Sequence, residues 1–346
     1  MNVYFTAATS TAAKTPSKQT ALMLGQQIDL PYFRVFEQPL LDLPTLYRLI
    51  ESQIEQTVQQ AGWKIADLKD IPIFLGSTGY VITDCEARLA HNQALPAEPS
   101  IAVAGDYLRE RYQTQVFSFA TSCTSSAHGV NYAYKMIKNG VYNKALVIGF
   151  EMFNRLTFEH FHAMHLLSQS SDYLPFVEPS GIVLGEGLAC VALSNQPHAQ
   201  FEAEILGMTS LTDNENLTNN SEQALRTLLE QICYNANLEK EHIRGIKVHG
   251  VGGNADMMEM AVLQAFFPNG RWILAKPFLG HTLGASGAME TAFLLDGLKS
   301  KSCPDLLKNP ENLPLAHGTT LENGYYLSYF LGFGGSNVGW GIRWNA

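Results

Sequence analysis

The sequence predicts an α/β fold with two similar halves, each built on a mixed sheet covered by helices. Short apolar runs typical of strands alternate with longer segments in which apolar residues recur at helical spacing. An apolar run, a turn of small residues and a helix follow one another at residues 116–140, and again at residues 245–267. Such alternation is typical of α/β architectures. The alternation begins again after residue 200, so we predict one half at residues 1–200 and the other at residues 201–346.

The first half is expected to begin with a strand and a polar loop. Apolar residues recur at helical spacing from Leu43 to Val58, and Pro44 suits a first helical turn, where the N–H that proline lacks would be unpaired. The polar stretch that runs to Gln27 predicts a loop. We predict strands at residues 3–7, 71–77, 116–119, 145–151 and, after a glycine-rich turn, within 180–194. We predict helices at residues 44–61 and 102–111, and after Cys123 as far as Gly140.

The second half repeats the alternation and closes with two strands. Residues 214–222 are polar and predict a surface loop. The other expected elements are a strand at 201–210, a helix at 224–235, a strand, turn and helix within 245–267, a strand at 272–275, a loop and helix within 276–298, and an antiparallel strand pair at 325–332 and 338–344.

Composition and charge exclude several classes of protein. The net charge is −9 and no dense Lys/Arg run occurs, which argues against a nucleic-acid binder. No run approaches the roughly 18 apolar residues of a membrane span, and no signal peptide is recognisable. The five cysteines include no CxxC pair and are odd in number, so reduced thiols and a cytoplasmic location are expected.

Two further patterns point only weakly to a bound group. His160, His162 and His165 lie within six residues, but no acidic or cysteine ligands accompany them, so ordinary packing is preferred over a metal site. The glycine-rich segment 180–194 lacks the third glycine and the following helix of a nucleotide-binding motif. We therefore expect no metal and no bound cofactor.

The turn that carries Cys123 is the first candidate for chemistry. Ala120, Thr121 and Ser122 are small, so a substrate can approach the sulfur closely. The amides and dipole at the start of the following helix favour a thiolate over a thiol. The competing interpretation is a small buried apolar residue.

Two histidines join the cysteine at loops that follow predicted strands. His249 and His281 both lie next to glycines, and sites in open α/β sheets form at the carboxyl ends of strands. A cysteine with two histidines permits a thiol nucleophile with a base, an acyl carrier with two imidazole donors, or a Cys-His-His metal site.

Four motifs in a fixed order resemble a known family. They are TSCTSSAHG around Cys123, VHGVGG around His249, KPFLGHTLGASGAMET around His281, and LGFGGSN at residues 331–337. They resemble the signatures of β-ketoacyl-[acyl-carrier-protein] synthases of the elongating type. The resemblance covers residues 71–344 and implies a thiolase-like fold layered α-β-α-β-α. It also implies decarboxylative Claisen condensation of malonyl-acyl-carrier protein with an acyl group on the cysteine, in fatty acid or polyketide and polyene synthesis.

The resemblance assigns roles to individual residues. Cys123 would accept the acyl group, and its amide and that of Phe333 would form an oxyanion hole. His249 and His281 would bind the malonyl thioester carbonyl and assist decarboxylation. Lys276 would orient the histidine site with Glu259 as its ionic partner, and the Phe333 ring would act as a gate. Substrates would arrive on the phosphopantetheine of an acyl carrier protein, so no other cofactor is implied.

The chain also departs from the family pattern. Val251 and Gly253 stand where the family has threonines that bind the pantetheine arm, and the loop at residues 175–185 is reduced. The expected partners are an acyl carrier protein and a second subunit, in a homodimer or in a heterodimer with another ketosynthase-like chain. The alternative function is a largely non-catalytic subunit similar to a chain-length factor, although those subunits usually lose the cysteine that this chain keeps. A cysteine hydrolase is a third class.

Overall fold

The computed structural model describes residues 1–23, 25–97, 100–215, 218, 220–268, 270–306, 313–318 and 320–346. In this part of the chain, ten strands form one sheet in the order β10-β9-β11-β12-β8-β1-β7-β6-β4-β5. The strands of the first half are β1 (Tyr4–Ala12), β4 (Ile73–Gly76), β5 (Val116–Phe119), β6 (Lys144–Glu151) and β7 (Gly187–Ser194). Those of the second half are β8 (Glu202–Thr212), β9 (Ile243–Lys247), β10 (Arg271–Ile273), β11 (Gly324–Leu331) and β12 (Ser336–Asn345).

The two halves have the same strand order. Counted from the middle of the sheet, the first half reads β1-β7-β6-β4-β5 and the second reads β8-β12-β11-β9-β10. Corresponding pairs also share direction, since β4 is parallel to β5 and β6 as β9 is parallel to β10 and β11. The halves join through a short antiparallel contact between β1 and β8. The predicted mixed sheets and similar halves are confirmed, whereas the assignment of residues 1–200 and 201–346 to separate domains stays a prediction.

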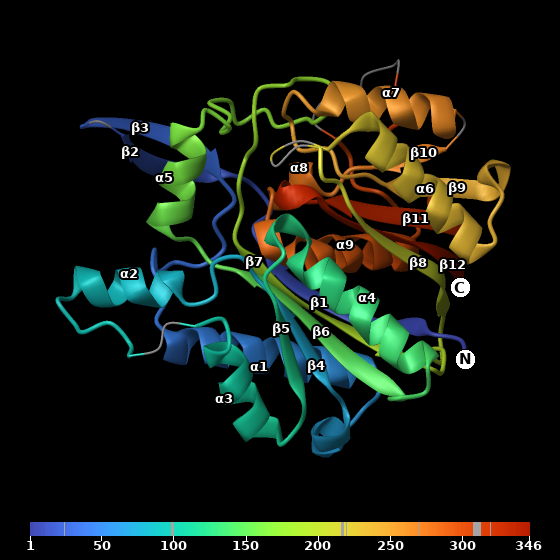
Figure 1. Cartoon of the computed structure of the whole chain (residues 1–346), viewed down its shortest axis with the longest axis horizontal. Coiled ribbons are helices and arrows are strands. Elements are labelled where there is room, and N and C mark those ends of the chain that lie inside the picture. Colours follow the sequence, from blue (N-terminus) through green and yellow to red (C-terminus); the bar gives the residue numbers. More distant parts are fainter. Residues whose placement is uncertain are drawn as a thin grey trace.

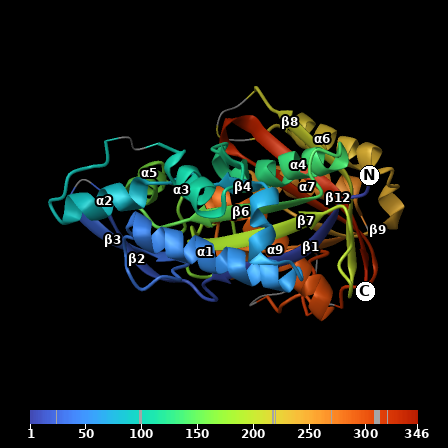
Figure 2. The same cartoon turned by 90° about the horizontal axis from the view of Figure 1, so that it is seen from below.

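Helices divide the sheet into layers. α4 (Ser125–Lys138) and α9 (Ser286–Ser300) lie between the strands of the two halves and contact both (Figure 1). α1 (Leu43–Gln60) and α3 (Val103–Tyr112) cover the outer face of the first half, and Figure 2 shows α1 lying across its strands. α6 (Glu222–Ala236) and α7 (Asp256–Phe266) cover the outer face of the second half. This is the α-β-α-β-α arrangement.

The central helices pass each other closely because their contact residues are small. A side chain at Gly287 of α9 would meet the backbone nitrogen of Ala127 in α4 at 2.1 Å. One at Gly76, the last residue of β4, would meet the nitrogen of Ser126 at 2.2 Å. These contacts hold the turn before α4 against the turn before α9. The first of these turns carries Cys123, and the second directly follows His281 in the sequence.

The prediction of a loop up to Gln27 is wrong. β1 continues to Ala12, and β2 (Ser17–Met23) pairs with β3 (Gln26–Tyr32) as an antiparallel hairpin. The hairpin lies beside α5 (Arg155–Ala163), away from the main sheet (Figure 1). Polar residues dominate it because only inward positions such as Ala21 and Leu30 are buried. α5, α2 (Ile82–Ala90) and the short α8 (Lys276–Leu279) also lay outside the predicted helices.

All five cysteines carry free thiols. In the described part of the chain, no helix combines the length and apolar character that crossing a membrane requires.

Candidate active site

Cys123 lies in a 3-10 turn, Ser122–Thr124, that joins β5 to α4. Ser122 has φ 53°, a left-handed conformation that turns the chain sharply from strand to helix. The Cys123 side chain is 6% exposed and lines a cavity of about 460 Å³. Two predicted donors face it, since the backbone amides of Phe333 and of Cys123 itself donate to the thiol.

The expected thiolate at Cys123 is wrong for the protein without substrate. Burial raises the pKa of the thiol to about 12. The Lys276 ammonium and the two amide donors act in the opposite direction but are outweighed. The sequence argument considered the amides and the helix dipole, whereas the loss of water around the sulfur has the larger effect.

The two histidines meet in the same cavity. His249 follows β9, and the rings of His249 and His281 lie perpendicular with centroids 5.8 Å apart. The backbone of His281 is fixed by the first half, because its N–H donates to the Val183 carbonyl at 2.8 Å and its carbonyl accepts from Gly185 N–H at 3.1 Å. The Ser286 hydroxyl lies 3.2 Å from His281 Nδ1.

Both imidazoles are neutral at neutral pH. Burial, and then the charge of Lys276, hold the pKa of His249 and of His281 well below 6.5. Neutral imidazoles can donate hydrogen bonds to a developing oxyanion. Among the described residues, no three His, Cys, Asp or Glu side chains are grouped as a metal ion would require.

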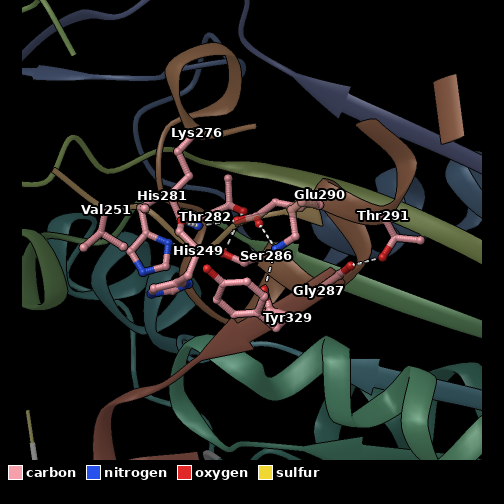
Figure 3. A network of polar contacts seen from close by, with 12 residues as sticks. His249, Val251, Lys276, His281, Thr282, Ser286, Gly287, Glu290, Thr291 and Tyr329 are labelled. Carbon is pink, nitrogen blue, oxygen red and sulfur yellow. Dashed lines mark hydrogen bonds and ion pairs between the residues drawn. The ribbon is translucent and has the colours of Figure 1, made fainter. Parts of the chain in front are cut away.

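Lys276 does not pair with Glu259, so that prediction is wrong. Its ammonium forms an ion pair with Glu290 Oε1 at 2.7 Å and donates to the His249 carbonyl at 2.5 Å. The other oxygen of Glu290 pairs with Lys247 at 2.6 Å. All three charged side chains are 1% exposed or less. Figure 3 shows Lys276 and Glu290 together with the two histidines. One carboxylate thus pairs with two buried lysines behind the histidines.

Glu259 shapes the histidine turn instead. From the first turn of α7, it accepts the backbone N–H of His249 at 2.9 Å and that of Gly250 at 3.1 Å. The Tyr329 hydroxyl also donates to it, at 2.5 Å. Burial, and then the charge of Asp256, raise the pKa of Glu259 to about 7. Asp256 accepts the next two amides of the turn, at residues 251 and 252.

Phe333 lies opposite a second aromatic ring at the cavity wall. Its ring is parallel to that of Phe161 on α5, with centroids 6.1 Å apart. Gly334 and Gly335 have φ of 78° and 71°, which glycine adopts readily, and a side chain at Gly335 would meet the Asp213 carbonyl at 1.8 Å. The glycines of the LGFGGSN motif therefore fix the Phe333 amide near the thiol.

The cavity brings together Cys123, His249, His281, Glu259 and Phe333, while Lys276 lies behind the histidines. Sequence reasoning missed Lys247, Glu290 and Phe161, and it assigned ordinary packing to His165, which lines the cavity. Two of them carried a signal. Glu290 is an isolated charge among small and apolar residues of the quoted KPFLGHTLGASGAMET motif, and Lys247 is a charge between the apolar residues Ile246 and Val248.

The wall that would face a pantetheine arm is largely apolar. Val251 and Gly253 line the cavity, as do Met164, Met258 and Ile182. Of the polar lining residues, Asn254 directly follows Gly253, whereas Ser180 and Asn220 belong to other segments. No threonine hydroxyl is available at the two positions where the family has one.

Comparison with known proteins agrees with this geometry. Residues 4–199 match the family described as "Beta-ketoacyl synthase, N-terminal domain", and residues 202–309 match "Beta-ketoacyl synthase, C-terminal domain". The chain is 28% identical over 251 residues to 3-oxoacyl-[acyl-carrier-protein] synthase 2 of Coxiella burnetii, covering 64% of this chain and 59% of that protein. It is 24% identical over 324 residues to the enzyme of the same name from Rhizobium meliloti, covering 82% and 77%. The chain thus spans less than two thirds of the Coxiella protein.

Solved structures share the fold at lower identity. A ketosynthase, ApeO, in complex with its chain length factor, ApeC, from Xenorhabdus doucetiae is similar with TM-score 0.82 and 18% identity, covering 99% of this chain and 98% of the other. A type II polyketide ketosynthase complex with its acyl-carrier protein, AntDE:AntF, is similar with TM-score 0.84 and 15% identity, covering 99% of each chain. With both family domains matched in order, the chain belongs to the β-ketoacyl synthase family.

Proposed function

We propose that this protein joins an acyl group on Cys123 to malonyl-acyl-carrier protein and releases 3-oxoacyl-acyl-carrier protein and CO₂. The observation that carries the proposal is one cavity that contains a thiol facing two backbone amides, together with two neutral imidazoles. Neither half supplies this set alone, because Cys123 comes from the first half and both histidines from the second.

In the first step, the thiol sulfur attacks the acyl thioester of the carrier. The carbonyl oxygen becomes an oxyanion, which the amides of Cys123 and Phe333 stabilise. The bond to the carrier sulfur breaks, and the thiol proton leaves with that sulfur. Because burial raises the thiol pKa, the proton is transferred during the attack rather than lost beforehand.

In the second step, malonyl thioester replaces the departed carrier. His249 and His281 donate to its carbonyl oxygen, the bond to the carboxylate breaks, and CO₂ leaves its electron pair in an enolate. The reaction uses the tautomer in which the Ser286 hydroxyl donates to Nδ1, which lies 3.2 Å away, and His281 carries its proton on Nε2. The enolate carbon attacks the acyl carbonyl, the carbon–sulfur bond to Cys123 breaks, and the sulfur takes up a proton.

We further propose an acyl carrier protein and a second ketosynthase-like subunit as partners. Solved relatives include one such complex with a chain length factor and one with an acyl-carrier protein. On this chain, β5 ends the sheet and pairs with β4 on one side only among the described strands. Unpaired strand edges are sites of pairing with another chain.

The test is acylation of Cys123. The purified protein is incubated with acyl-acyl-carrier protein, and its intact mass is measured together with the labelled peptide. We expect one acyl adduct on Cys123, its loss in Cys123→Ala and its retention in Cys233→Ala, which removes a buried thiol on α6. An unlabelled Cys123, with full product formation by Cys123→Ala in the assembled system, would exclude the proposed reaction.

Two observations favour a second candidate, a non-catalytic subunit that shapes the tunnel of a competent partner. They are the pKa of Cys123, raised by burial to about 12, and the missing hydroxyls at Val251 and Gly253. In that case the acyl adduct forms on the co-expressed ketosynthase only, and Cys123→Ala changes product length rather than rate.

A further inference from the structure

A group of aromatic side chains closes the apolar region next to Cys123. Cys123, Phe161 and Ile182 line the active-site cavity, and they belong to the same buried cluster as Tyr32, Phe153 and Phe158. The latter three residues do not line that cavity. They line a separate space of about 10 Å³, together with Leu184 and Leu283. A space of this size holds at most about one water molecule.

The closure is tightly packed. The Tyr32 ring contacts that of Phe153 at 5.3 Å and 83° and that of Phe158 at 5.6 Å and 84°, both edge to face. Such contacts stabilise aromatic pairs beyond their buried area. The side chains are 4%, 4% and 1% exposed, respectively. They come from the end of β3, from the segment after β6 and from α5, so three separate parts of the chain converge here.

Geometry indicates that an acyl chain on Cys123 would run toward this group. Its carbonyl oxygen would face the amides of Cys123 and Phe333, which donate to the thiol, and the malonyl group would occupy the part of the cavity that His249 and His281 line. The Cys123 turn packs against the turn Leu283–Ala285. Leu283 lines the small space and belongs to the same buried cluster as Cys123 and the three rings, so buried apolar side chains continue from the sulfur past Leu283 to the rings.

We propose that Tyr32, Phe153 and Phe158 close the acyl end of the site and restrict the acyl group on Cys123 to short chains. This inference rests on the proposed function and names its substrate class, short-chain acyl thioesters. A longer chain would have to displace packed rings, and a protein interior resists even one added methylene. Tyr32 is central because it contacts both other rings and belongs to the hairpin, which the family motifs do not include.

The test measures chain-length preference at Cys123. Acetyl-, butanoyl-, hexanoyl- and decanoyl-acyl-carrier protein are offered separately, and the initial rate of Cys123 acylation is followed by intact mass. In the wild-type protein we expect decanoyl transfer to be slower than acetyl transfer by at least about tenfold. In Tyr32→Ala, the decanoyl-to-acetyl rate ratio should rise by at least about tenfold, because the space vacated by the ring extends the pocket.

Three further variants make the test decisive. Phe158→Ala opens the same space from α5, should shift the ratio the same way, and serves if Tyr32→Ala does not fold. Tyr32→Phe keeps the ring and should retain the preference for short chains. Tyr112→Ala removes a buried tyrosine from a different cluster and should leave the ratio as in the wild type.

Two results would overturn the proposal that the three rings limit chain length. They are a wild-type protein that takes decanoyl and acetyl groups at equal rates, and alanine variants at Tyr32 and Phe158 that leave the decanoyl-to-acetyl rate ratio unchanged. The absence of any adduct with every chain length would instead reject the proposed function.

Discussion

At the scale of single residues, the buried charges behind the histidines are unevenly matched. Lys247 and Lys276 share Glu290, which gives two cations and one anion in a region closed to water. Burial alone would raise the pKa of Glu290, but the two ammonium groups outweigh burial and lower it. The excess positive charge lies next to the neutral imidazoles, where an enolate oxygen would develop.

This imbalance predicts unequal effects of two substitutions. Glu290→Gln leaves two buried ammonium groups without an anion and should lower the free energy of unfolding by about 3–5 kcal/mol. Lys247→Met leaves Glu290 and Lys276 as a matched pair and should lower it by less than about 2 kcal/mol. Urea denaturation of both variants measures the difference. Equal stability of the two variants would contradict the role of Glu290 as the anion that both lysines share.

The Cys123 thiol gives a prediction of pH dependence. Because burial raises its pKa to about 12, its thiolate fraction grows with every step of pH through the range 7 to 10. The rate of iodoacetamide labelling at Cys123 should therefore rise about tenfold per pH unit with no plateau in that range. Mass spectrometry of the labelled peptide measures the rate, and half-buried Cys85 serves as an internal comparison. A plateau near neutral pH would show a thiolate held by the helix dipole.

At the scale of elements, the contact between α4 and α9 sets the distance between the two parts of the site. A side chain at Gly287 would meet backbone atoms of Ala127, which cannot move aside as a flexible side chain would. Gly287→Ala should therefore destabilise the protein by about 1–3 kcal/mol and slow acylation of Cys123. Gly297→Ala on the same helix is the matched control, because its nearest neighbours would lie at 3.2 Å or more and alanine favours helix. Thermal unfolding and the acylation assay report both effects, and equal behaviour of the two variants would contradict this account.

The helices and strands also differ in how well the sequence predicts them. Helices and strands with a clear apolar period, such as α1, α4 and β6, were predicted within a few residues because burial itself creates that period. The β2–β3 hairpin was not predicted, since it buries few side chains and its polar composition matches that of a loop. Cys123, His249 and His281 were found from motifs. The partner of Lys276 was not, because Glu259 and Glu290 are equally plausible in sequence and only the position of α9 in the fold brings Glu290 to Lys276.

At the scale of the whole molecule, the sheet ends in an edge that is poorly protected. β5 has no second neighbour among the described strands, and Phe117 and Phe119 on it are only half-buried. Tyr132 of α4 is 46% exposed beside Phe119, with ring centroids 5.2 Å apart. An aromatic surface next to an unpaired strand suits a second subunit of similar fold, which could continue the sheet.

This surface predicts where subunit pairing can be broken. Tyr132→Glu combined with Phe119→Asp places two carboxylates at the edge, where pairing would bury them without partners, and should convert the paired state to single chains. Native mass spectrometry of the chain alone, and of the chain co-expressed with a ketosynthase homologue, measures the change and separates a homodimer from a heterodimer. Tyr234→Glu is the control, because Tyr234 is 85% exposed on α6, at the opposite side of the layered fold. If the double variant keeps the native mass of the wild-type complex, the second subunit does not bind at the β5 edge.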